Sequence, residues 1–158
     1  MVRFSGVVLV LVLALVATPV ILAQYGGGGD YGYEQTTPAG VVEQIRTART
    51  HATYSAGSEV LRGVLEHLGH VVNCLEGPRG KNYDAKNDNP CQGQGAGVIP
   101  DLESAGRSTM TTTKALDAAR DADKIAVETL KLTDLARAKT AASKVADLLS
   151  EALRAVSQ

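Results

Sequence analysis

Histidine and cysteine are the residue types in this sequence whose spacing suits metal chemistry. His67 and His70 lie three residues apart, and Cys74 follows four residues after His70. On an α-helix these spacings place the three side chains on one face, within roughly 60° of arc. Neutral imidazole suits Cu, Zn and Ni, so the histidine pair predicts a transition-metal site. Glu66 lies beside this face and is a candidate further ligand or acceptor for a ring N–H.

The third histidine, His51, belongs to an earlier segment. On one straight helix it would lie about 24 Å from the pair, but a chain reversal near Gly57 would bring it close enough to complete a three-histidine site. The alternative is that the histidines are structural residues at helix boundaries. His67 lies at the edge of the apolar stripe and His70 further out, so His70 is expected to be the more solvated. Aromatic residues make up 4% of the chain, which gives no sign of a haem-sized pocket.

The two cysteines, Cys74 and Cys91, flank a segment rich in Gly, Pro, Asn and Asp. In an exported protein an even number of cysteines indicates disulfides, and with two the pairing is forced. The alternative is that Cys74 is a thiolate ligand of a metal. Residues 77–100 show no helical period, and a loop this long needs to be tied down or to have a function.

Residues 1–23 have the pattern of a secretory signal peptide. Arg3 supplies a basic start, an apolar run follows, and Ala23 is the small residue before a cleavage point. An uncleaved membrane anchor is the alternative, because the apolar run approaches the ~20 residues that span a bilayer. Residues 24–37 are expected to form a flexible linker rich in Gly and Tyr. The expected location is periplasmic or secreted, with no stable membrane insertion after cleavage.

The rest of the chain, residues 38–158, is predicted to form a single all-α domain, a small bundle of three to four helices with a disulfide-closed loop. Its apolar residues are mostly Ala, Leu and Val, which suit close helix packing. Thr37 is expected to cap a helix that begins at Pro38. Two apolar stripes follow at helical spacing, rotated by roughly 140° from each other. They consist of Val41, Ile45, Ala48 and Ala52, and of Val60, Val64, Leu68, Val71 and Leu75.

That rotation predicts either a break near Gly57, with Ser58 capping a second helix, or one long helix buried on different sides. Another helical pattern begins at Asp101 and runs to Leu130, with a Thr-rich step of modest helix propensity in its middle. Thr133-Asp134 indicates a turn and a new cap before the last helix.

Composition limits the classes of function. The net charge of −1 at pH 7, with mixed signs along the chain, argues against nucleic-acid binding and gives no electrostatic case for adhesion to anionic membranes. No spacing of Ser, His and Asp or of paired carboxylates indicates catalysis, so the protein is not expected to be an enzyme. The leading hypothesis is transition-metal binding through His67 and His70, with His51 and the nearby carboxylate of Glu66 as candidate further ligands. The alternative is a structural or partner-binding protein that recognises an unknown protein through residues 77–97.

Three motifs carry a resemblance to known proteins: THATYSAG, HLGHVVNCLEGPRG and NPCQGQGAG. Over residues 41–102 the chain resembles a group of small exported bacterial helical proteins with an H-x-x-H-V-V-N-C-L block and a P-C-x-G-x-G block. It is also distantly similar to small histidine-containing periplasmic metal-binding proteins. That resemblance implies metal binding through His51, His67 and His70, at a single site rather than as a high-capacity buffer.

Overall fold

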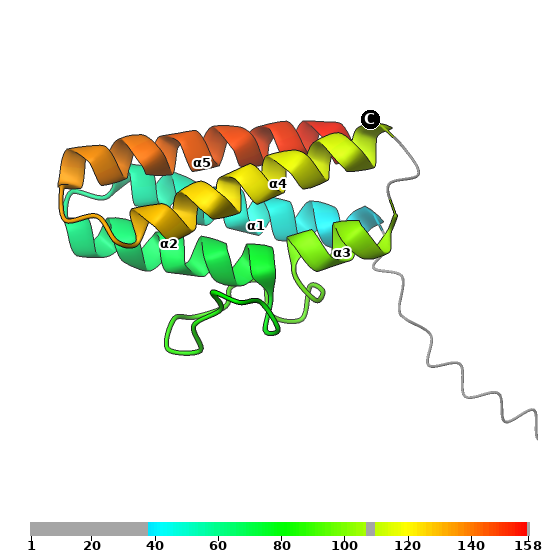
Figure 1. The fold of residues 1–158 in the computed structure, drawn as a ribbon, viewed down its shortest axis with the longest axis horizontal. Helices are drawn as coiled ribbons and strands as arrows, with labels where there is room; N and C mark the ends of the chain where they lie inside the picture. Colours follow the sequence, from blue (N-terminus) through cyan, green and yellow to red (C-terminus); the bar gives the residue numbers. More distant parts are fainter. Residues whose placement is uncertain (1–37, 107–109, 158) are drawn as a thin grey trace, which may run out of the picture. The chain divides into compact units, whose positions relative to one another are not determined.

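The computed structural model describes residues 38–106 and 110–157, and these residues form five helices and no strand (Figure 1). The helices are α1 (Pro38–Gly57), α2 (Leu61–Glu76), α3 (Val98–Ser104), α4 (Met110–Thr129) and α5 (Leu135–Val156). The all-α prediction is therefore confirmed. The expected signal peptide (1–23), the expected linker (24–37) and the Thr37 cap lie outside the described residues.

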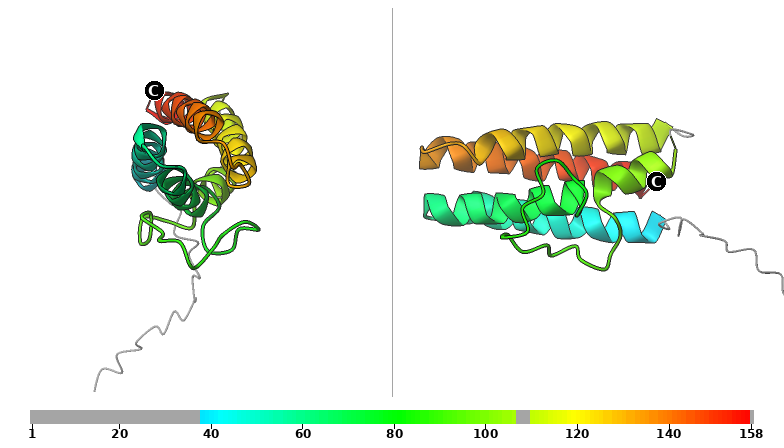
Figure 2. Two further views of the ribbon diagram at one scale, coloured as in Figure 1. Left: turned by 90° about the vertical axis from the view of Figure 1, so that its left-hand side faces the viewer. Right: turned by 60° about the horizontal axis from the view of Figure 1, so that its bottom comes forward.

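The four long helices form an up-down-up-down bundle, which Figure 2 shows end-on. Helix α1 packs against α2 and α5, and α4 packs against α5 and α2, so each long helix has two antiparallel neighbours. Short connections join α1 to α2 and α4 to α5, as is usual for antiparallel neighbours in a bundle. The short helix α3 contacts α4, α2 and α1 at the opposite end from these connections. No described helix has the length and hydropathy needed to cross a bilayer.

The core is built from small and branched aliphatic side chains. Both apolar stripes of the first hairpin point inward as predicted, except that Val60 is exposed because it precedes α2. Helices α4 and α5 present mostly alanine to the same core, and such small side chains allow helices to approach closely. The buried residues of these two helices include Ala115, Ala119, Ala122, Ala126, Ala138, Ala142, Val145 and Leu149.

The chain reverses between Gly57 and Leu61, which confirms two helices rather than one. The expected cap at Ser58 is wrong. The residue that precedes α2 is Val60, and no side chain caps its amides. The Ser58 hydroxyl instead donates to the Val60 carbonyl at 3.1 Å, so it is used within the turn.

The helix expected from Asp101 to Leu130 is divided in two. Helix α3 already begins at Val98, since Pro100 fits in a first turn where its missing N–H is not needed. The long loop is therefore shorter than the expected 77–100 and ends at Gly97. Helix α3 stops because Gly106 has a φ of 75°, a left-handed conformation that ends helices. At the start of α5 the predicted cap is confirmed, because Asp134 accepts a hydrogen bond from the Arg137 N–H at 2.7 Å.

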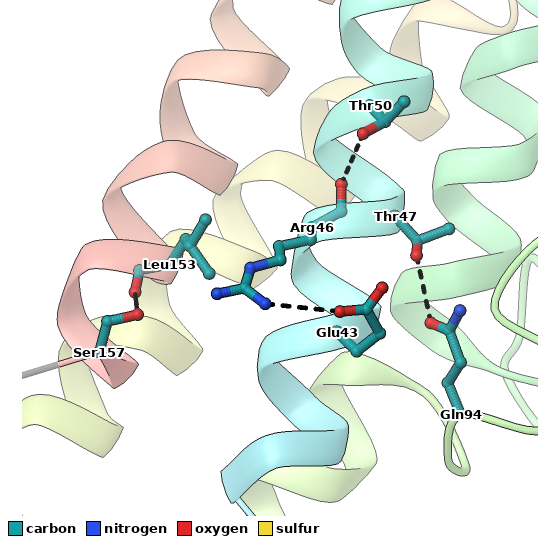
Figure 3. A network of polar contacts seen from close by, with 7 residues as sticks. All are labelled: Glu43, Arg46, Thr47, Thr50, Gln94, Leu153 and Ser157. Atoms are coloured by element: carbon teal, nitrogen blue, oxygen red, sulfur yellow. Dashed lines mark hydrogen bonds and ion pairs between the residues drawn. The ribbon is translucent and has the colours of Figure 1, made fainter.

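The second half of the long loop is held against α1. The Thr47 hydroxyl donates to Gln94 Oε1 at 3.2 Å, close to the Glu43–Arg46 ion pair on the same helix (Figure 3). Buried beneath them, Gln44 Nε2 donates to Asp101 Oδ2 at 2.7 Å, which connects α1 to α3.

Candidate metal centre

The α1–α2 hairpin brings the chain's three histidines together. His51 lies on α1, and His67 and His70 lie one turn apart on α2. The ring centroid of His51 lies 5.5 Å from that of His67 and 5.0 Å from that of His70. The His67 and His70 centroids are 5.6 Å apart. The expectation that a reversal near Gly57 would bring His51 to the pair is therefore confirmed.

The imidazole nitrogens converge. One ring nitrogen from each histidine lies within 4.8 Å of the others, and this is the only such group of three or more His, Cys, Asp or Glu residues in the part of the chain that the structure describes. His51 Nδ1 and His70 Nδ1 are 3.1 Å apart and share a hydrogen bond, in which one of the two nitrogens carries the proton. Two nitrogens bound to one tetrahedral zinc at 2.0–2.1 Å lie about 3.3 Å apart, so this pair already has the spacing of two ligands.

His67 Nδ1 adds an independent feature. It is buried and has no hydrogen-bond partner. Buried polar atoms in folded proteins nearly always have a partner, and an exception calls for an explanation such as an ion at the site. An ion bound beside this nitrogen would satisfy it.

The electrostatic environment keeps two of the rings neutral. Burial lowers the pKa of His51 below its usual value, and the neighbouring His70 and His67 lower it further. Burial also lowers the pKa of His70, as does His67, while the charges of Asp88 and Glu66 act in the opposite direction. Neutral imidazole is the form that binds metal, so these two rings need not lose a proton first.

His70 is the most buried of the three, at 8% exposed, whereas His51 and His67 are partly exposed. The expectation that His70 would be the more solvated is therefore wrong. The loop 77–97 folds back over this part of α2, so that a Cβ added at Gly69 would lie 2.8 Å from Asn87 Nδ2. A helical projection of α2 contains only the residues of that helix, so it cannot show burial of His70 by another segment of the chain.

Two anchors hold that loop beside the histidines. The predicted disulfide between Cys74 and Cys91 is present, with a Cα–Cα distance of 5.2 Å. The fully buried Asn73 accepts a hydrogen bond from the Asp84 N–H at 3.0 Å. Its amide nitrogen donates to the carbonyls of Asp84, Asn87 and Asp88. The alternative role of Cys74 as a thiolate ligand is excluded in this oxidised form, since its sulfur is bonded to Cys91.

Glu66, the fourth residue of the predicted site, is exposed and lies outside the group of converging ligand atoms. Its charge acts on His70 from a distance. Sequence reasoning missed Tyr54, whose ring lies 5.8 Å from that of His51 and 5.6 Å from that of His67. Its position three residues after His51 on the same helix was the signal, because such pairs share a face.

Comparison with protein-family models, with curated proteins and with solved structures gives no match. The functional assignment therefore depends on the geometry of the three histidines.

Proposed function

We propose that this protein is an exported, non-catalytic helical bundle that binds one transition-metal ion through His51, His67 and His70. The observation that carries the proposal is the convergence of three imidazole nitrogens within 4.8 Å. The unpartnered, buried His67 Nδ1 supports it. Three imidazoles suit Cu, Zn or Ni, whereas Mg and Ca prefer oxygen ligands.

The compartment forms part of the proposal. The Cys74–Cys91 disulfide is typical of oxidising environments outside the cytosol. The signal-peptide pattern of residues 1–23 points the same way. A periplasmic or secreted protein meets metal ions outside the cytosol, so we propose that the site binds its ion after export.

Direct binding measurements test the proposal. The exported full chain is titrated with Cu²⁺, Zn²⁺ and Ni²⁺ against a chelator of known affinity. We expect one equivalent of at least one ion to bind, and His51→Ala, His67→Ala and His70→Ala each to weaken binding by about tenfold or more, because each removes a direct ligand. Arg62→Ala is the matched control, since Arg62 is an exposed residue of α2.

Circular dichroism of each variant separates loss of the site from loss of the fold. Binding that persists unchanged in all three folded alanine variants would contradict the proposal. Such a result would favour the alternative, a partner-binding protein. Loop 77–97 would then be the surface to test, because its conformation is fixed by the disulfide and by Asn73 while residues such as Arg79 and Lys86 are exposed.

A further inference from the structure

The candidate site supplies fewer ligands than a first-row metal ion usually takes. Zinc in proteins is almost always four-coordinate, and sites with three protein ligands keep a fourth position for an exogenous group. The converging group contains three residues, each offering one ligand atom. Both cysteines are joined to each other and cannot serve as thiolates.

The three histidines differ in how they face solvent, which locates the open side. His70 is buried, and loop 77–97 lies against the neighbouring residues of α2, where Asn87 contacts Gly69 and accepts a hydrogen bond from Asn73. His51 and His67 are only partly buried. Both lie against the ring of Tyr54, which is 55% exposed. The approach from solvent therefore lies along Tyr54, between α1 and α2.

The charge of the ligand set indicates what would occupy that position. Three neutral imidazoles carry no charge, so a complex of them with a divalent ion keeps the ion's full charge of +2. Asp88 and Glu66 act on His70 through space, but neither belongs to the converging group. A partly exposed centre with a net charge of about +2 attracts a small anion in preference to a neutral molecule.

We propose that a metal ion held by His51, His67 and His70 keeps one coordination position for an exchangeable small anion, on the Tyr54 side of the site. This inference rests on the proposed function. The competing possibility is that the carboxylate of Glu66, one helical turn before His70 on α2, binds the metal as the fourth ligand and leaves no position for an anion.

Azide is the probe. The full chain is loaded with one equivalent of Cu²⁺, or with Co²⁺ where Zn²⁺ is the preferred ion, and titrated with sodium azide while absorption is recorded. We expect a saturable azide-to-metal charge-transfer band for Cu²⁺, or a shift of the visible bands for Co²⁺. Tyr54→Ala is expected to change the azide Kd about threefold or more, with metal stoichiometry kept at one. Glu66→Gln should behave like the parent, as should the control Arg62→Ala.

Each result has a distinct meaning. A metal-loaded parent whose spectrum ignores azide would overturn the inference while leaving the proposed function intact. If azide then binds to Glu66→Gln alone, Glu66 is the fourth ligand. An azide Kd unchanged in Tyr54→Ala would overturn the placement of the open position beside Tyr54. Failure of the parent to bind any of the metal ions would overturn the proposed function and this inference together.

Discussion

Asp123 is the carboxyl group whose ionisation the fold disturbs most clearly. It lies on α4, where burial raises its pKa to about 7, aided by the charge of Glu76 and by a hydrogen bond with it. Its Oδ1 atom is buried without a partner. Glu76 also accepts a hydrogen bond from the Asn82 N–H, so the pair connects α4, the end of α2 and the start of the loop. The raised pKa of Asp123 makes this junction dependent on pH.

The sign of that dependence follows from the raised pKa. The unfolded chain loses the Asp123 proton near 3.8 and the folded chain near 7, so the contribution is complete below 3.8 and is lost as the pH rises to about 7. Asp123→Asn removes this loss because an amide does not ionise. We expect the variant to be more stable than the parent by roughly 1–2 kcal/mol at pH 8, with a smaller difference at pH 4.5.

Urea unfolding at the two pH values measures the difference. Asp121→Asn is the control, because Asp121 is an exposed residue of the same helix. A difference between variant and parent that is the same at both pH values would show that Asp123 ionises normally in the folded protein.

At the scale of elements, loop 77–97 is the unit that completes the candidate site. It follows α2 directly, lies beside that helix (Figure 2), and is joined to it through the Cys74–Cys91 disulfide and the contact of Asn87 with Gly69. The four long helices pack against one another along their whole lengths, and the loop contributes Cys91 to the core they share. We therefore expect the rest of the loop to loosen while the bundle stays folded.

Replacing both cysteines tests whether loop 77–97 can loosen independently of the four-helix bundle. The disulfide spans a sequence separation of 17, for which the chain-entropy model gives about 3 kcal/mol. We expect Cys74→Ala/Cys91→Ala to lower the free energy of unfolding by about 2–4 kcal/mol while keeping the helical circular dichroism. Hydrogen exchange should increase in residues 77–97 and remain slow in α4 and α5, which pack against each other without the loop. Equal acceleration in α4 and α5 would show that the loop and the bundle unfold together.

The same elements show what the sequence can predict. The stripes of α1 and α2 were predictable because helical spacing marks the buried side, and residues such as Ile45 and Leu68 are fully buried. The break between α3 and α4 is not predicted because Ala105 and Leu116, eleven residues apart, lie on the same side of a continuous helix, although Gly106 is a visible stop signal. The sequence predicts the three-histidine group only if the chain reverses near Gly57, because His51 lies on a different helical segment from His67 and His70. The burial of His70 depends on how the loop that follows α2 packs back on that helix, which no local pattern contains.

At the scale of the whole molecule, the candidate site takes its residues from two helices of the bundle, α1 and α2. His51 on α1 and the pair on α2 come together only when the hairpin is formed. The unfolded chain holds these histidines 16 and 19 residues apart, which weakens any joint binding to one ion. An ion bound by all three should therefore favour the folded bundle.

Thermal unfolding measures that preference. Zn²⁺ is the suitable ion because it is redox-inert. At a free concentration of about 100 times its Kd, a ligand that binds only the folded state adds about 2.7 kcal/mol of stability. For a domain of this size we expect Tm to rise on the order of 5–10 °C, and excess EDTA to reverse the rise. The rise in Tm should be mostly lost in His51→Ala, because the remaining ligands all lie on α2 and the ion no longer links the two helices. A full rise in Tm in His51→Ala would mean that the ion binds one helix, and that the α1–α2 junction takes no part in holding it.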